Sequence, residues 1–311
     1  MASPNHFRIF SFLVLVLLLG TLPNSSFATT RKLTSLFQLP ALVLNYHNGP
    51  LLKGTNKVNL YWYGNFSSAQ RSIITDFIQS MNPANSPPAP SVASWWQTTA
   101  NYKGGPSNIV LGKQIIDENY SLGKSLTTAQ VLQIASTPPH KYTIGIVLTA
   151  ADVTVDQFCM ICGSHTFGYS NLKRRRGKYA VGWVGNPVSQ CPGQCAWPLA
   201  QAEFGPQTPP LGAPNGDVGM DGMVMNLATI LAGAVTNPFD NGYFQGLASA
   251  PLEAVSACTG IYGSGAYSGY PGLLLVDSAN GASYNCQGVN GRKYLLPAMW
   301  DPNTSQCRTL V

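Results

Sequence analysis

The key to the architecture of this chain is the segment Asp221-Gly222-Met223-Val224-Met225-Asn226-Leu227-Ala228-Thr229-Ile230-Leu231-Ala232-Gly233-Ala234. Apolar residues fall on nearly all sides of a helix built from it, so such a helix has no face suited to water. We therefore predict a buried helix that Asp221 caps and that ends before Pro238.

Strand and helix patterns alternate on the N-terminal side of this segment. Apolar residues predict strands at 58–62, 108–116, 142–149 and 179–184. Helical spacing and capping residues predict helices that begin after Ser67, after Ser91, and at Thr127 or Thr128. Because the two kinds of element interleave, the helices should pack on a mixed sheet.

The rest of the chain is rich in loops. Residues 191–219 are dominated by Pro, Gly and Gln, and residues 242–311 are rich in Gly and Tyr. We find neither an internal repeat nor a clean linker. The predicted fold is α/β: a single compact domain at 41–311 with a mixed sheet, packed helices and a loop- and Gly-rich C-terminal third.

The composition excludes several classes of protein. Of 311 residues, 45% are hydrophobic and only 10% are charged, which excludes a charged disordered chain and a coiled coil. The formal net charge is +6, and the basic residues are scattered except in one run, Lys173-Arg174-Arg175-Arg176-Gly177-Lys178. A nucleic-acid-binding protein would show a stronger basic stripe. The run is either a loop that contacts an acidic polymer such as a wall polysaccharide, or a solvated loop.

The N-terminus indicates secretion. Arg8 precedes an apolar run at 9–19, and Ala28 ends a cleavage pattern, so residues 1–28 are predicted to be a signal peptide followed by a short segment at 29–40. The run is too short to span a bilayer, and no later segment is predicted to do so. Glycosylation sequons occur at Asn65, Asn119 and Asn303.

Seven cysteines lie in the C-terminal half, at 159, 162, 191, 195, 258, 286 and 307. The pairs Cys159/Cys162 and Cys191/Cys195 have a spacing that zinc sites also use. In an oxidising compartment the same pattern favours disulfides. Seven is an odd number, so at least one thiol is left over, and the pairing cannot be read from the sequence.

Candidate catalytic residues are few. Asp217 and Asp221 form the best local pair of carboxylates, although a turn and a helix cap explain them without catalysis and are the favoured interpretation. His165 follows a cysteine pair and could serve in a triad or as a structural histidine. No complete catalytic constellation, cofactor motif or metal-ligand set is present, which favours a non-enzymatic protein without a cofactor.

Several long motifs of the mature chain resemble the EXORDIUM-like family of land plants, also called the phosphate-induced protein family. The motifs are Tyr46-His47-Asn48-Gly49-Pro50-Leu51-Leu52, Trp62-Tyr63-Gly64, Pro90-Ser91-Val92-Ala93-Ser94-Trp95-Trp96, Gln190-Cys191-Pro192-Gly193-Gln194-Cys195-Ala196-Trp197-Pro198, Asn215-Gly216-Asp217-Val218-Gly219-Met220-Asp221-Gly222-Met223 and Gly291-Arg292-Lys293-Tyr294-Leu295-Leu296-Pro297-Ala298-Met299-Trp300-Asp301-Pro302. The resemblance implies an apoplastic protein linked to brassinosteroid-dependent growth and to carbon status, with no established enzymatic activity.

The resemblance also bears on the odd cysteine. The family usually has no cysteine where Cys286 stands, which implies that Cys286 is the free thiol and that Cys159, Cys162, Cys191, Cys195, Cys258 and Cys307 pair. A second, shorter resemblance is to a helix end in some bacterial metallopeptidases. Their His-Glu-x-x-Glu positions correspond here to Thr229, Ile230 and Gly233, which cannot hold zinc. This second resemblance implies a zincin-like scaffold in which the helix that corresponds to the catalytic one has only a packing role.

Three hypotheses follow for the function. The favoured one is a secreted, non-enzymatic protein that influences growth by binding a cell-wall polysaccharide or a surface receptor. The second is an extracellular hydrolase of wall glycan or peptide that uses Asp217, Asp221 and His165. The third is a structural wall protein crosslinked through its fourteen tyrosines, which the well-patterned core argues against.

Overall fold

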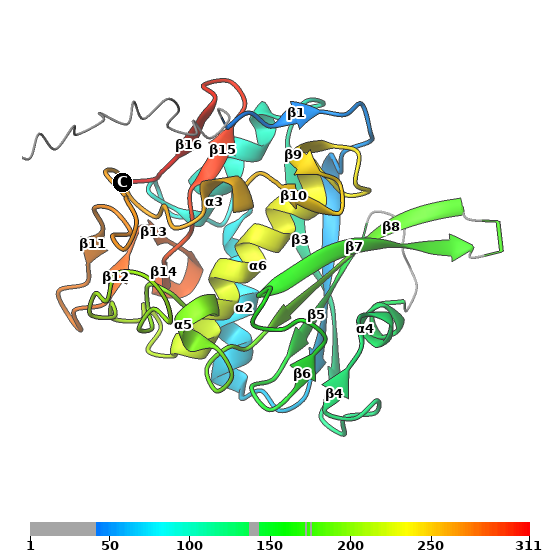
Figure 1. Ribbon diagram of the computed structural model, residues 1–311, viewed down its shortest axis with the longest axis horizontal. Helices are drawn as coiled ribbons and strands as arrows, with labels where there is room; N and C mark the ends of the chain where they lie inside the picture. Colours follow the sequence, from blue (N-terminus) through cyan, green and yellow to red (C-terminus); the bar gives the residue numbers. More distant parts are fainter. Residues whose placement is uncertain (1–41, 137–142, 172, 175) are drawn as a thin grey trace, which may run out of the picture. The chain divides into compact units, whose positions relative to one another are not determined.

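A five-stranded mixed sheet is the framework of the protein in a computed structural model, which describes residues 42–136, 143–171, 173–174 and 176–311 (Figure 1). The strand order is β3-β2-β5-β8-β7. The bounds are β2 (Gly54–Tyr63), β3 (Ser107–Asp117), β5 (Thr143–Thr149), β8 (Arg176–Gly185) and β7 (Gly163–Asn171). Four strands are parallel, and β7 runs antiparallel to β8 at one edge. The predicted α/β class with a mixed sheet is confirmed.

Helices begin where the capping residues predict them. The side chains of Ser67, Ser91 and Thr127 each accept a hydrogen bond from the backbone N–H three residues later. In return, the side-chain oxygen of that later residue accepts the backbone N–H of the capping residue. These caps start α2 (Ser68–Ser80), α3 (Val92–Trp96) and α4 (Thr128–Ile134). The predicted helices at these places are therefore confirmed.

The helix α6 (Val218–Thr236) is the buried helix that the apolar segment predicts. It begins earlier than expected, because the Asp217 carboxylate accepts the backbone N–H of Met220 at 3.0 Å and is the N-cap. The predicted cap at Asp221 is wrong; Val218 and Met220 continue the apolar pattern by one turn, which places Asp221 inside the helix. By length and composition α6 could cross a membrane, but its burial within the domain marks a core helix.

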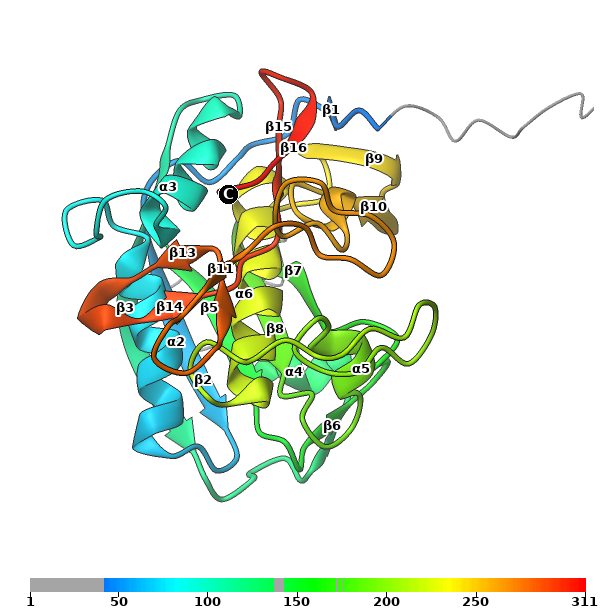
Figure 2. The same ribbon diagram turned by 90° about the vertical axis from the view of Figure 1, so that its left-hand side faces the viewer.

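Helices cover both faces of the sheet. Gly145 and Ile146 are consecutive in β5, so they face opposite sides. A Cβ built on Gly145 would lie 3.3 Å from Ala135 at the end of α4, whereas one built on Gly182 of β8 would lie 2.7 Å from both Ile146 and Ile230 of α6. α4 and α6 therefore cover opposite faces, and α6 can approach β8 closely because Gly182 has no side chain. α2 lies beside α6 (Figure 2).

The C-terminal third consists of short elements joined by loops, as predicted. Small antiparallel pairs lie around α6, and residues 42–311 form one unit of the chain. The remaining elements are β1 (Asn45–Tyr46), η1 (Gln97–Asn101), β4 (Ser125–Leu126), β6 (Thr154–Val155), α5 (Pro192–Cys195), β9 (Tyr243–Leu247), β10 (Ala250–Leu252), η2 (Ser256–Cys258), β11 (Leu275–Val276), β12 (Ser283–Tyr284), β13 (Cys286–Gln287), η3 (Val289–Gly291), β14 (Lys293–Tyr294), β15 (Met299–Asp301) and β16 (Gln306–Arg308). The predicted signal peptide (1–28) and the segment at 29–40 lie outside the described residues.

Three disulfides fix the loops that secondary structure does not. The bonded pairs are Cys159–Cys191, Cys162–Cys195 and Cys258–Cys307. Cys286 is a buried free thiol. Each bridge closes 32 to 49 residues, a loop length for which one crosslink contributes about 3 to 4 kcal/mol. Because the four sulfurs of the first two pairs are bonded to one another, they are not available as zinc ligands.

Candidate binding groove

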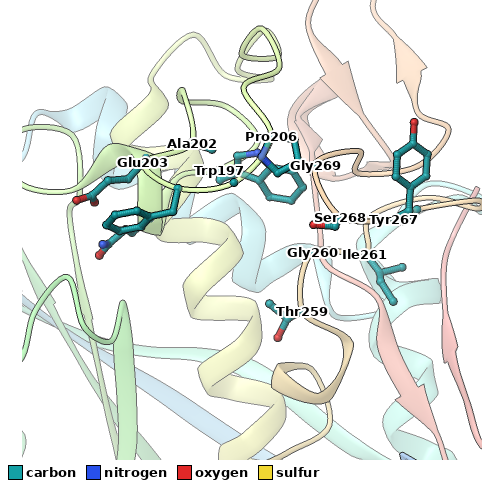
Figure 3. Close-up of a pocket in the computed structure, with 15 residues that line it drawn as sticks. Trp197, Ala202, Glu203, Pro206, Thr259, Gly260, Ile261, Tyr267, Ser268 and Gly269 are labelled. Carbon is teal, nitrogen blue, oxygen red and sulfur yellow. The ribbon is translucent and has the colours of Figure 1, made fainter. Parts of the chain in front are cut away.

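A groove of about 620 Å³ opens between two loops of the C-terminal half. One loop follows α5 and the other follows η2 (Figure 3). The lining residues are Gly193, Gln194, Trp197, Ala202, Glu203, Phe204, Gly205, Pro206, Thr259, Gly260, Ile261, Ala266, Tyr267, Ser268 and Gly269. The volume is that of a typical small-ligand site.

Both loops are anchored at their roots. Cys191, which immediately precedes α5, and Cys195, the last residue of α5, are each bonded to a cysteine that precedes β7, and Cys258 of η2 is bonded to Cys307 of β16. The loops also meet across the groove, because the Thr208 hydroxyl donates to the carbonyl oxygen of Gly269 at 3.2 Å. The groove is therefore largely formed before any ligand arrives.

Three aromatic side chains line the groove: the half-buried Trp197 and the exposed Phe204 and Tyr267. The Trp197 ring packs 6.0 Å from the buried ring of Tyr262, and Tyr262 donates a hydrogen bond to the Trp197 carbonyl oxygen. Tyr267 is 70% exposed and lies 5.0 Å from Tyr270, with which it exchanges two backbone hydrogen bonds. Phe204 is 76% exposed. Exposed rings gathered around a cavity are typical of a ligand surface rather than of a folding requirement.

The polar groups of the groove are few. Glu203 carries the single carboxylate among the lining residues, and Gln194, Thr259 and Ser268 add an amide and two hydroxyls. Glu203 lies at the opposite end of the groove from Tyr267 (Figure 3). A mostly apolar surface with a few hydrogen-bonding groups can orient a ligand without carrying strong charge.

The predicted catalytic residues do not come together. Asp217 caps α6, and its second carboxylate oxygen accepts the Gln70 amide at 3.0 Å. Asp221 is buried one turn later, where both its oxygens accept N–H groups of Asn215 at 2.8 and 2.6 Å. His165 of β7 lies beside Gly233, twelve residues along α6 from Asp221, which is about 18 Å of helix.

His165 belongs to a closed polar cluster. Its Nε2 lies 2.7 Å from Glu253 Oε2, and the two side chains are 6% and 13% exposed. Asn237 donates to the other oxygen of Glu253 at 2.6 Å. A Cβ on Gly233 would lie within 2.7 Å of the His165–Glu253 pair, so the pair occupies the space that a side chain there would take. A histidine buried in this way can brace the fold but has no route to a substrate.

The charge state of that pair follows from its surroundings. Burial lowers the pKa of His165, but the Glu253 carboxylate raises it by charge and hydrogen bonding, and the pKa ends above its ordinary value. The pair therefore stabilises the fold fully below about pH 6.5 and loses this contribution as pH rises through the raised pKa.

The remaining predicted site residues occupy separate places. Lys173 and Arg174 are exposed at the turn between β7 and β8, Arg175 lies outside the described residues, and β8 begins at Arg176, so the run is not wholly a loop. Lys178 lies over the Phe167 ring at 4.1 Å. The sequon residues Asn65, Asn119 and Asn303 are all exposed.

Metal binding finds no support in the part of the chain that the structure describes. No group of three or more His, Cys, Asp or Glu side chains there could hold a metal ion. On α6, Thr229 donates its hydroxyl to the Met225 carbonyl oxygen, and Ile230 is buried against the sheet.

Comparison with known proteins decides the family. The sequence-family model described as the phosphate-induced protein 1 conserved region matches residues 44–310. The chain belongs to this family. The match covers nearly all the described residues, so the sheet, α6 and the groove are all within the family's conserved region. The predicted resemblance to EXORDIUM-like proteins is confirmed.

Curated members of the phosphate-induced protein 1 family are similar over most of their length. Protein EXORDIUM-like 2 of Arabidopsis thaliana is 60% identical over 276 residues, which are 87% of this chain and 90% of that protein. Protein PHOSPHATE-INDUCED 1 of Nicotiana tabacum is 54% identical over 99% of this chain and 100% of its own. Protein EXORDIUM of Arabidopsis thaliana is 51% identical over 98% of each. No solved structure matches this member of the family.

A prediction follows for Asp221. Burial raises its pKa to about 7, although hydrogen bonds from Asn215 act in the opposite direction. Ionising Asp221 in the folded protein is therefore unfavourable, and stability should fall between about pH 4 and pH 7 by at most about 4 kcal/mol. The Asp221→Asn variant stays neutral, so its stability should decrease much less over this pH range. Urea unfolding of both proteins at pH 4, 6 and 8 measures it; parallel pH profiles would contradict the assignment.

Proposed function

We propose that this chain is a secreted, apoplastic, non-enzymatic protein that takes part in plant growth regulation by binding a cell-wall polysaccharide in the groove. The family resemblance implies two such growth responses, namely brassinosteroid-dependent growth and the response to carbon status. The observation that carries the binding role is a set of three aromatic rings around one cavity: Phe204 and Tyr267, which are exposed, and Trp197, which is half-buried.

Sugar rings fit such a surface. A pyranose presents a face of C–H bonds that packs on the electron-rich face of an aromatic ring, and its edge presents hydroxyls. Gln194, Thr259 and Ser268 can hydrogen-bond those hydroxyls at the groove. Because Glu203 is the one charged side chain among the lining residues, the groove favours a neutral glycan over a polyuronate.

The groove suits binding better than cleavage. Glycoside hydrolysis uses two carboxyl groups that face each other across the scissile bond. The lining residues supply only Glu203, and Asp217 and Asp221 are held elsewhere, at the start of α6. The hydrolase hypothesis therefore has no acid pair at the groove.

The cysteine pairing, the sequons and the N-terminal pattern support the proposed secretion. Disulfides persist in oxidising compartments, and six of the seven cysteines are paired. The three sequons are exposed, and residues 1–28 have the pattern of a signal peptide. A receptor on the cell surface is the alternative partner for the same groove.

Groove variants test the binding role. Trp197→Ala and Tyr267→Ala should each weaken binding to insoluble xylan or cellulose about 5-fold, because each removes a ring worth about 1 kcal/mol of contact. Leu247→Ala removes an apolar side chain on β9 that is about as exposed as Tyr267, and this variant should bind like the wild type. Binding isotherms of the purified, secreted protein provide the measurement.

The salt dependence of binding distinguishes the groove from the basic run at 173–178 as the site that holds the glycan. Retention by neutral glycan should persist at 0.5 M salt, whereas retention by polygalacturonate through Lys173 and Arg174 should be screened. Equal retention of wild type and both groove variants on every neutral glycan would overturn the proposal, and binding to membranes alone would favour a receptor.

A second test concerns secretion and glycans. A plant cell expressing the full chain should release it with an N-terminus at residue 29, and peptide N-glycosidase should lower its mass. Asn119→Gln should remove one glycan, since Asn119 is exposed at the end of β3. Mass spectrometry of the culture medium and of the cells makes the measurement. Retention of the unprocessed chain in the cells would contradict secretion.

A further inference from the structure

A second cavity, of about 390 Å³, lies beside the N-terminal end of α6 and shares no residue with the groove. Its surface is polar, unlike that of the groove. The lining residues are Asp76, Pro214, Asn215, Gly216, Asp277, Asn280, Asn290, Gly291, Arg292 and Lys293. They come from α2, from the loop before α6, from the turn between β11 and β12, and from the segment around η3.

Arg292 is held rigidly at this cavity. Its Nε donates to Asp76 at 3.0 Å, its Nη1 to the Asn215 side-chain oxygen at 3.2 Å, and its Nη2 to the Ser72 hydroxyl at 2.6 Å. A guanidinium fixed by three partners loses little freedom when a ligand binds, and it has two further N–H groups to offer.

The charges of the cavity cancel. Arg292 pairs with Asp76, and Lys293 pairs with Asp277 at 2.6 Å. These four side chains are 11 to 27% exposed, so each pair is largely shielded from water. A free anion or cation would gain attraction from one partner and repulsion from the other, which favours a neutral ligand.

Unused hydrogen-bonding groups remain at the rim. Asn290 donates to Asp76 at 2.9 Å, and Asn280 accepts the backbone N–H of Ala282 at 2.9 Å. Among the described residues, the Asn290 side-chain oxygen and the Asn280 NH₂ group have no protein partner. The ammonium of Lys293 has further donors beyond the one given to Asp277. Both donors and acceptors are therefore available to a ligand at one small cavity.

We propose that this cavity binds a single neutral sugar residue, a pyranose whose hydroxyls meet the rim of Asn280, Asn290, Arg292 and Lys293. A hydroxyl both donates and accepts, so the hydroxyls of a sugar match a mixed set of donors and acceptors that a carboxylate or an ammonium could only half satisfy. The backbone supports the rim: Asn290 has φ 56° and Gly291 φ 71°, a tight turn that carries the Asn290 amide at the cavity. This site does not depend on the groove being a polysaccharide site.

The test is a titration of the ¹⁵N-labelled protein with glucose, xylose, galacturonate and inorganic phosphate, each followed by NMR. Tyr267→Ala serves as background, so that binding in the groove is weakened while the second cavity is intact. Glucose or xylose should shift the amide signals of residues 280 and 290–293 in a saturable way, with a dissociation constant in the millimolar range. Xylobiose added in parallel shows whether a free sugar or a chain end is preferred.

Asn290→Gly is the decisive variant, because glycine keeps the positive φ and removes only the amide. It should weaken sugar binding at least 10-fold. Asn48→Gly, at another exposed asparagine with φ 64°, is the matched control and should leave binding unchanged. Shifts produced only by galacturonate or phosphate, no shifts with any probe, or equal binding by Asn290→Gly would each overturn the proposal.

Discussion

The burial of α6 on all sides is the constraint on which the rest of the structure depends. Of its nineteen residues, sixteen are buried, so other parts of the chain must cover the whole circumference. β7 and β8 cover one side, and α2 covers another. The loop-rich C-terminal third supplies the remaining cover, with Met225 of α6 packed among Leu199, Tyr262 and Leu295.

That cover also creates the groove. Tyr262 belongs to the same buried cluster as Met225, and its ring packs against that of Trp197, so residues that close the core also support one aromatic side chain of the groove. Surface loops are generally more mobile than the helices and strands that they connect. Here the disulfides of α5 and η2 fix the roots of both loops, which lets the exposed rings keep a defined spacing.

The sequence predicts most of the framework because local patterns carry it. Alternating and continuous apolar runs mark four strands, and three capping residues mark helix starts. The cap of α6 was misplaced because Asp217 and Asp221 both precede apolar residues, and only the Met220 N–H distinguishes them. The edge strand β7 has few strong strand formers and was not predicted. The groove aromatics were missed because exposure depends on which loops meet, and periodicity carries no such information.

A crystal structure of the protein with a neutral xylo- or cello-oligosaccharide tests the account's central claim most directly. The account predicts sugar rings stacked on Trp197 and Tyr267, between the loops that follow α5 and η2, with hydroxyls near Gln194, Thr259 or Ser268. An empty groove at saturating oligosaccharide, or ordered sugar bound only on another face of the protein, would contradict it.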